Sequence, residues 1–309
     1  MGDPRLNVSL KQLLNSKKVV PYVLLLPFFA FFLVFRLWPI LWSFFISFTE
    51  YFGSGIKFIG FDNYVQLFND RVFWIATKNT VYFVVVYNAI MISLALMVAV
   101  FLSSRLVRIR DFFRSVYFVP MAMMLPVVAI TFDMIFARNI GLISAVYGLF
   151  GKEFSTRWFS DPDLAMWAII IMRVWRAMGY YCAYFLAGLA SIPQEIYESS
   201  QIDGAGRFRT FFRITLPLLK PMLLFVVIMS TILSFEIFDE PWILTQGGPA
   251  NSTLTLQIYL YQTSFLNGEL GKGSAIAYMM TLFMIVFSVL YVNQLSEKNP
   301  RRKRAKQQG

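Results

Sequence analysis

The chain is 309 residues long, with 58% hydrophobic and only 15% charged residues, and its mean hydropathy is +0.60. A soluble globular domain carries about a quarter charged residues, so this composition excludes a soluble protein and indicates an integral membrane protein. The net charge of +11 would raise nucleic acid as a partner of a soluble chain. Here the basic residues cluster beside apolar segments, so we expect the chain to contact membrane lipid and not nucleic acid.

Residue types that support catalysis or metal binding are scarce. The chain has no histidine and one cysteine, Cys182, so it lacks the usual neutral-pH acid–base group and cannot form an intrachain disulfide. These absences argue against a metal site and against a membrane-embedded enzyme. The sequence also lacks a Gly-x-x-x-x-Gly-Lys-Ser/Thr loop, so we expect a non-catalytic chain that holds no cofactor and does not hydrolyse ATP itself.

Six apolar segments are long enough to cross a bilayer, which requires about 20 residues. They predict an all-α polytopic membrane protein whose transmembrane domain covers residues 19–294, between an N-terminal tail (1–18) and a basic tail (295–309). The first segment lacks a small-residue cleavage pattern, so we expect it to be an uncleaved span. The six segments are residues 19–48, 80–102, 112–136, 164–190, 217–244 and 275–292.

Lysine and arginine residues are distributed unevenly among the connections. When Arg114 and Lys220, which lie just inside the following segments, are counted with the connections before them, the two tails and the connections after the second and fourth segments each carry at least four, whereas the other connections carry at most three. Because positively charged connections stay in the cytoplasm, we expect both termini and residues 191–216 to be cytoplasmic. A short amphipathic helix over residues 63–68 is predicted on the opposite side.

The connection at residues 191–216 is too polar to lie in lipid and too regular in pattern for an irregular loop. Ser191 and Gln194 fit a capping box, which predicts a short helix that ends near Asp203, where Gly204 and Gly206 follow.

A second short helix is predicted to begin near Arg207. Its phenylalanines share one face and its arginines lie on another, which leaves two alternatives open. The helix could lie in the membrane interface, with its rings in lipid and its arginines at headgroups, or it could contact a partner in the water. The residues concerned are Phe208, Phe211, Phe212, Arg209 and Arg213.

Five positions in this connection stand at the spacing of a known motif: Glu198, Gly204, Ile214, Leu216 and Pro217. The pattern resembles the EAA loop of ABC importer permeases, with Ser199 and Ser200 in place of two alanines. Three further segments are similar to the carbohydrate-uptake, maltose-permease-like branch of that family. They are residues 58–64, 175–193 and 238–253.

This resemblance implies a type I ABC importer permease in a bacterial or archaeal inner membrane, which imports a sugar, most simply an oligosaccharide. It implies a second homologous permease, two cytoplasmic ATPases that hold ATP and Mg, and an extracytoplasmic sugar-binding protein. It also implies that the loop docks on the ATPase and transmits its ATP-driven closure. The residues implied in coupling are Glu198, Ser199, Ser200, Asp203, Gly204, Ala205, Phe208, Phe211, Ile214, Leu216 and Pro217.

Charged residues also occur within the fourth and fifth segments, where a charge usually faces a cavity or a partner. On straight helices, Arg176 would lie about 25 Å from Pro193 and Glu236 about 28 Å from Pro217, at similar depth. Glu236 and Glu240 would share a face, and Pro241 is expected to end that helix.

Two alternatives remain for these charges: a salt-bridge cluster that joins the two spans, or a polar cavity for sugar. An ion-gradient-driven secondary transporter, with the carboxylates carrying protons, is the alternative function, although the internal repeats of such transporters are not seen. The sequence does not identify the sugar. Together with the resemblance, it predicts a substrate path at Arg173, Arg176, Ala177, Tyr180, Ser234, Glu236, Asp239 and Glu240.

Overall fold

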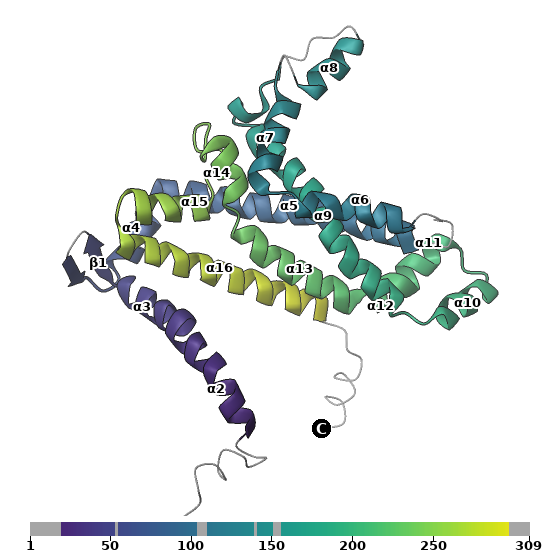
Figure 1. The fold of residues 1–309 in the computed structure, drawn as a ribbon, viewed down its shortest axis with the longest axis horizontal. Coiled ribbons are helices and arrows are strands. Elements are labelled where there is room, and N and C mark those ends of the chain that lie inside the picture. The colour runs from purple at the N-terminus through teal and green to yellow at the C-terminus, as the bar shows by residue number, and fades with distance from the viewer. Residues whose placement is uncertain (1–19, 53–54, 104–109, 139–140, 151–155, 297–309) are drawn as a thin grey trace, which may run out of the picture. The chain divides into compact units, whose positions relative to one another are not determined.

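The computed structural model describes residues 20–52, 55–103, 110–138, 141–150 and 156–296, and Figure 1 shows its helices. The predicted N-terminal tail and nearly all of the basic tail lie outside these residues. The described chain is mainly helical, which confirms the all-α class. It divides into two compact units, residues 1–66 with 263–275 and residues 67–262 with 276–309.

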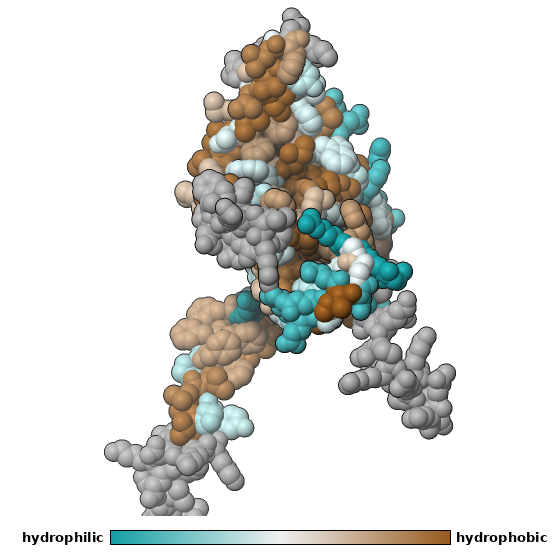
Figure 2. All heavy atoms as spheres, turned by 90° about the vertical axis from the view of Figure 1, so that its right-hand side faces the viewer, coloured by the Kyte–Doolittle hydropathy of each residue, from teal (hydrophilic) through white to brown (hydrophobic). Residues whose placement is uncertain are grey.

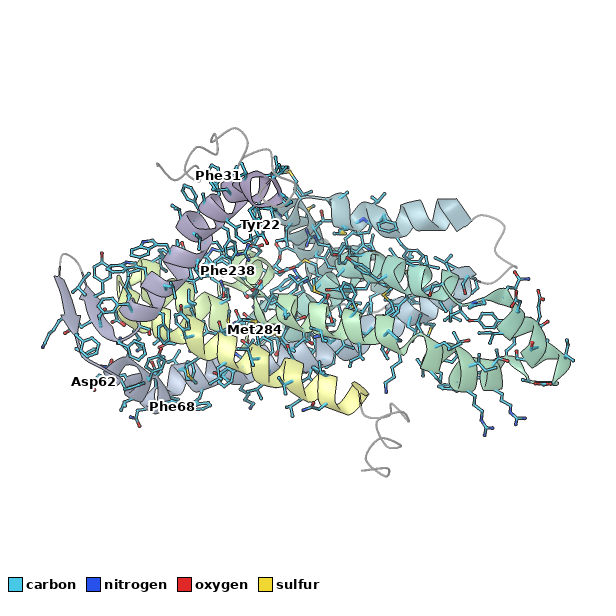
Figure 3. The ribbon with its side chains drawn as sticks, turned by 90° about the horizontal axis from the view of Figure 1, so that it is seen from below. Tyr22, Phe31, Asp62, Phe68, Phe238 and Met284 are labelled. Carbon is cyan, nitrogen blue, oxygen red and sulfur yellow. The ribbon has the colours of Figure 1, made fainter. Side chains whose placement is uncertain are left out.

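The first unit begins with one long apolar helix. Its central π-helical turn ends at Leu37, two residues before Pro39, whose ring nitrogen cannot donate a hydrogen bond to the Phe35 carbonyl. Almost all of its side chains are exposed, including Tyr22 and Phe31, which Figure 3 labels. The three parts of the helix are α2 (Val20–Phe32), η1 (Leu33–Leu37) and α3 (Trp38–Ile46).

A short antiparallel hairpin, which the sequence did not predict, follows in the same unit. Its strands are β1 (Thr49–Phe52) and β2 (Gly55–Phe58), with Thr49 opposite Phe58. The predicted amphipathic helix is confirmed as α4 (Asp62–Asn69). Asn63 at its start donates hydrogen bonds to the carbonyls of Ser47 (2.9 Å) and Thr49 (2.8 Å), which joins α4 to the start of the hairpin.

The second unit is built around three helices that lie side by side in Figure 1: α5 (Arg71–Ser103), α9 (Ala165–Ala190) and α13 (Lys220–Phe235). Large apolar side chains of α5 and α9, among them Phe83, Met91 and Phe185, form its main core. Outside residues 194–218, the other described elements are α6 (Arg110–Ala122), α7 (Leu125–Phe136), α8 (Leu142–Leu149), η2 (Trp158–Ser160), α14 (Asp239–Thr245), α15 (Leu256–Tyr261), η4 (Gln262–Leu266) and α16 (Leu270–Ser296). Most of η4 and the start of α16 belong to the first unit.

All six predicted spans are helical, but two of them are broken. In the described residues three helices are long and apolar enough to cross a membrane, at 20–46, 71–103 and 270–293, or five if two bent pairs each count as one span. The α9 helix is not among the five, because its arginines and aromatic residues lower its hydropathy. At 26 residues it is nevertheless about 39 Å long, which exceeds the thickness of a hydrocarbon core.

Proline residues account for both bends. In the third predicted span, α6 and α7 meet at 111°, since Pro126 cannot donate a hydrogen bond to the Ala122 carbonyl. In the fifth, the helical segment 207–218 meets α13 at 66°, since Pro221 cannot donate to the carbonyl of Pro217. The prediction of one straight helix from residue 217 is therefore wrong.

A glycine allows α6 to approach α9 closely. A Cβ atom at Gly179 would lie 1.9 Å from the Tyr117 carbonyl oxygen, a distance that no real contact tolerates. Any larger residue at position 179 would push α6 away, so Gly179 fixes the packing of the helix that carries the charged residues Arg173 and Arg176.

Candidate functional site

The first candidate site is the segment between α9 and α13, called here the α10–α12 loop. It consists of α10 (Gln194–Ile202), α11 (Arg207–Thr210), the π-helical turn η3 (Phe211–Thr215) and α12 (Leu216–Leu218). The predicted sequence of helix, glycine bend and second helix from Arg207 is therefore confirmed.

Backbone hydrogen bonds fix the bend that ends α10. Gly204 has a φ of +72°, a left-handed conformation that residues with a side chain rarely adopt. Its N–H donates to the Gln201 carbonyl (3.0 Å), and the Ala205 N–H donates to the Ser200 carbonyl (2.9 Å). This pair of bonds is a Schellman motif, so the bend is a defined structure rather than a loose connection.

The predicted capping box at the start of α10 is wrong. Ser191 belongs to the end of α9, where its hydroxyl donates to the Gly188 carbonyl at 2.7 Å. Pro193 precedes the first residue of α10, without a side-chain cap. Gln194 instead donates through Nε2 to Glu198 Oε1 at 2.5 Å, one turn further along the exposed surface of α10.

Apolar side chains project from the tip of this loop. Ile202 is 87% exposed and Phe208 is 83% exposed, on either side of the Gly204 bend. Figure 2, which faces the loop, shows a mainly hydrophilic surface interrupted by a small apolar patch. Glu198 and Ser199 are also exposed. The tip of the loop therefore presents apolar side chains within an otherwise polar surface.

A pocket of about 230 Å³ lies between α10 and the helix that follows the bend. Four of the predicted coupling residues line it together with two arginines that the sequence analysis did not place there. Its lining residues are Ser200, Asp203, Ala205, Arg209, Arg213 and Ile214.

One side-chain contact that was not predicted also closes the loop. The Thr215 hydroxyl donates to the Tyr197 hydroxyl at 3.3 Å, which links η3 back to α10. Thr215 is buried and Phe211 is half-buried, whereas Phe212 is exposed. A sequence pattern gives no signal for this contact, because it depends on the extra residue of the π-helical turn.

The second candidate site is a buried ion pair between α9 and α14. Arg173 Nη1 donates to Glu240 Oε1, and the Glu240 side chain is only 1% exposed. Tyr87 of α5 and Tyr181 of α9 lie within electrostatic range of Arg173. The pair therefore joins two helices at a point that water hardly reaches.

The predicted common face of Glu236 and Glu240 does not exist. The α13 helix ends at Phe235, and α14 begins only at Asp239, so the two glutamates belong to different elements. Pro241 lies inside α14 and cannot donate to the Ile237 carbonyl. The Thr255 hydroxyl donates to that carbonyl instead, at 3.0 Å, which stabilises the break.

Only part of the predicted charge cluster comes together. Within the part of the chain that the structure describes, neither Glu236, Asp239 nor Arg176 forms an ion pair, and the two carboxylates are exposed. Arg173 and Glu240 are thus paired, and the other charges are not.

The remaining predicted residues have different surroundings. Ser234 is buried against α5, where it accepts a hydrogen bond from Asn88 Nδ2 at 3.3 Å and donates to the Ser230 carbonyl at 2.5 Å. Tyr180 lies on α9 with its hydroxyl 2.7 Å from that of Tyr184, and Ala177 packs against the main core. Asn88 was missed, although a lone polar residue in an apolar span was an available signal.

No group of three or more histidine, cysteine, aspartate or glutamate residues in the described ranges is placed to hold a metal ion. The single cysteine, Cys182, is buried in the main core.

Comparison with known proteins gives a consistent result. Residues 91–296 match the family described as "Binding-protein-dependent transport system inner membrane component". The chain is 36% identical over 283 residues to the arabinooligosaccharides transport system permease protein AraP of Bacillus subtilis, covering 91% of this chain and 90% of that protein. It is 38% identical over 270 residues to the lactose transport system permease protein LacF of Rhizobium radiobacter, covering 85% and 90%.

A solved structure shares the fold. A bacterial ABC transporter involved in the import of the acidic polysaccharide alginate superimposes with a TM-score of 0.80, over 91% of this chain and 96% of that one. At 20% identity, this likeness concerns the fold alone.

Proposed function

Since the chain belongs to the family of inner-membrane components of binding-protein-dependent transport systems, we propose that it is the permease subunit of an ATP-driven importer of oligosaccharides. The resemblance to ABC importer permeases is confirmed by this membership. Permeases of this family are transport subunits rather than enzymes. The sugar-transport names of the two relatives support an oligosaccharide as the substrate.

The observation that carries this proposal is the geometry of the α10–α12 loop. A Schellman motif at Gly204 holds two exposed apolar side chains, Ile202 and Phe208, at the tip of a polar loop. We assign this tip to contact with the ATPase, with Glu198 as a polar contact. The proposal requires the loop and both termini to be cytoplasmic, which the distribution of lysine and arginine supports.

The proposed assembly contains a second, homologous permease, two ATPase subunits and an extracytoplasmic sugar-binding protein. ATP and Mg²⁺ would be held by the ATPase subunits. Closure of the ATPases would move the loop, and α12 and the bend at Leu219 would pass this movement to α13. The substrate path would follow α9, where Arg173, Arg176 and Tyr180 interrupt an otherwise apolar span.

Reconstitution of the complete importer in proteoliposomes tests this function. We expect uptake of oligosaccharide that requires ATP and the loaded binding protein and that continues when an uncoupler collapses the proton gradient. Uptake that stops with the uncoupler while ATP is held constant would contradict the proposal and support a secondary transporter. Uptake without any ATPase subunit would contradict it as well.

A further inference from the structure

An unpaired cation lies in the middle of α9. Arg176 stands eleven residues after Ala165 and fourteen before Ala190, which places it about 17 Å and 21 Å from the two ends of the helix. Its Nε atom is buried without a hydrogen-bond partner, and Arg176 forms no ion pair with any residue that the structure describes. A charge at this depth is costly unless an anion or water accompanies it.

The neighbouring elements do not neutralise Arg176. Glu240 of α14 is already paired with Arg173, so these two charges cancel. Tyr87 of α5, which lies within electrostatic range of Arg173, Arg176 and Glu240, is a neutral phenol. The two other carboxylates of the predicted path, Glu236 and Asp239, are exposed and form no ion pair with Arg176 in the described residues, so the Arg176 charge has no paired counterion there.

Arg176 begins a stripe of half-exposed polar side chains on α9. Tyr180 and Tyr184 follow at intervals of four residues, so the three side chains lie near one another on the same side of the helix, over about 12 Å. The two tyrosine rings meet edge to face at 5.0 Å, and their hydroxyls are hydrogen-bonded. Tyrosine rings stack on sugar faces, and their hydroxyls pair with sugar hydroxyls.

We propose that this stripe conducts an acidic oligosaccharide, and that Arg176 binds the carboxylate of a uronic acid unit while Tyr180 and Tyr184 contact the sugar rings. A carboxylate can accept two parallel hydrogen bonds from a guanidinium. Nε is buried without a partner in both Arg173 and Arg176, but only the Arg173 guanidinium holds a carboxylate in the described residues. The inference rests on the proposed function, because it names the class of sugar that the importer carries.

The test compares acidic sugars with neutral sugars of the same shape. The complete importer in proteoliposomes is offered a panel of uronate oligosaccharides and the same oligosaccharides after reduction of their carboxyl groups. We expect ATP-driven uptake of at least one uronate member to exceed that of its neutral counterpart by about 10- to 100-fold. R176Q should remove most of this preference, and R176K, which keeps the charge, should retain part of it.

Arg36→Gln is the matched control, because Arg36 lies in another long apolar helix and is exposed there. It should leave the preference unchanged. Equal uptake of acidic and neutral members by the wild type would overturn the inference. The inference would also be overturned if R176Q lowered both the uptake of all sugars and the amount of assembled importer. That result would indicate that the partner of Arg176 is a carboxylate of the second permease. Absence of ATP-driven uptake of any sugar would contradict the proposed function itself.

Discussion

The α10–α12 loop and the Arg173–Glu240 pair are two polar regions that the chain holds in place by opposite means. In the loop, backbone hydrogen bonds around Gly204 fix the conformation, while side chains such as Ile202 and Phe208 project outward. At the pair, two side chains are enclosed by other helices, and the nearby backbone between α13 and α14 is irregular.

This difference separates effects on function from effects on stability. Exposed side chains contribute little to folding, so substitutions at the loop surface should change communication with a partner. A buried charge that loses its partner is strongly destabilising, so substitutions at the pair should change folding first. Four substitutions test this contrast, in order of decreasing effect on the free energy of unfolding.

Glu240→Ala should have the largest effect, because it leaves the Arg173 charge buried and unpaired. We expect a loss of about 3–5 kcal/mol, measured as a lower unfolding temperature of the purified protein in nanodiscs. The double variant Arg173→Met with Glu240→Ala removes both charges and should recover much of this loss. If the loss in free energy of unfolding of the double variant equals the sum of the losses of the two single variants, no pair exists.

Thr255→Val should cost roughly 2–3 kcal/mol, because the hydroxyl both donates to the Ile237 carbonyl and caps the first turn of α15. Thr281→Val is the control, since Thr281 is exposed and its hydroxyl bonds only within its own helix. Equal unfolding temperatures for the two variants would mean that the break before α14 is stabilised by other contacts.

Gly204→Pro should destabilise the loop by roughly 1–3 kcal/mol, because proline cannot adopt a φ of +72°. We expect the protein to insert in the membrane but to lose ATP-driven uptake, which is measured in the reconstituted importer. Gly206→Pro is the matched control, since Gly206 already has a φ of −68°. Full uptake by both proline variants would remove the loop from the proposed coupling.

Glu198→Lys should change stability by less than about 0.5 kcal/mol, because the side chain is exposed. The ratio of sugar molecules imported to ATP hydrolysed should nevertheless fall. Glu195→Lys makes the same change of charge at another exposed position of α10. If the two variants have the same ratio as the wild type, Glu198 has no specific role in coupling.

The same contrast explains which features could be predicted from the sequence. The bend at Asp203-Gly204-Ala205 follows from local turn chemistry and was predicted correctly. Hydropathy located the six helical segments, but it did not show that two of them are broken. The ion pair could not be assigned, because depth was counted along a straight fifth helix. Pro221 signalled the bend at the start of that helix, but not the direction of the parts on either side. Pro241 was expected to end the helix, whereas α13 already ends at Phe235 and Pro241 lies inside α14.

The pairing of individual side chains could not be predicted from the sequence. Which arginine pairs with which glutamate depends on how α14 packs on α9, a property of tertiary structure that spacing does not encode. The capping box failed for a related reason, since Ser191 completes the preceding helix before it can begin the next one.

The number of residues in the π-helical turn η3 affects the direction in which the tip of the α10–α12 loop points. Each residue of an α-helix turns the chain by about 100° and advances it by about 1.5 Å. Removing one residue from Phe211–Thr215 would therefore rotate the preceding part of the loop, including α10 and α11, about the helix axis by about a quarter of a full turn relative to α12. Ile202 and Phe208 would keep their local contacts but would point in a different direction. The number of residues in η3 therefore determines the direction in which the tip of the loop points.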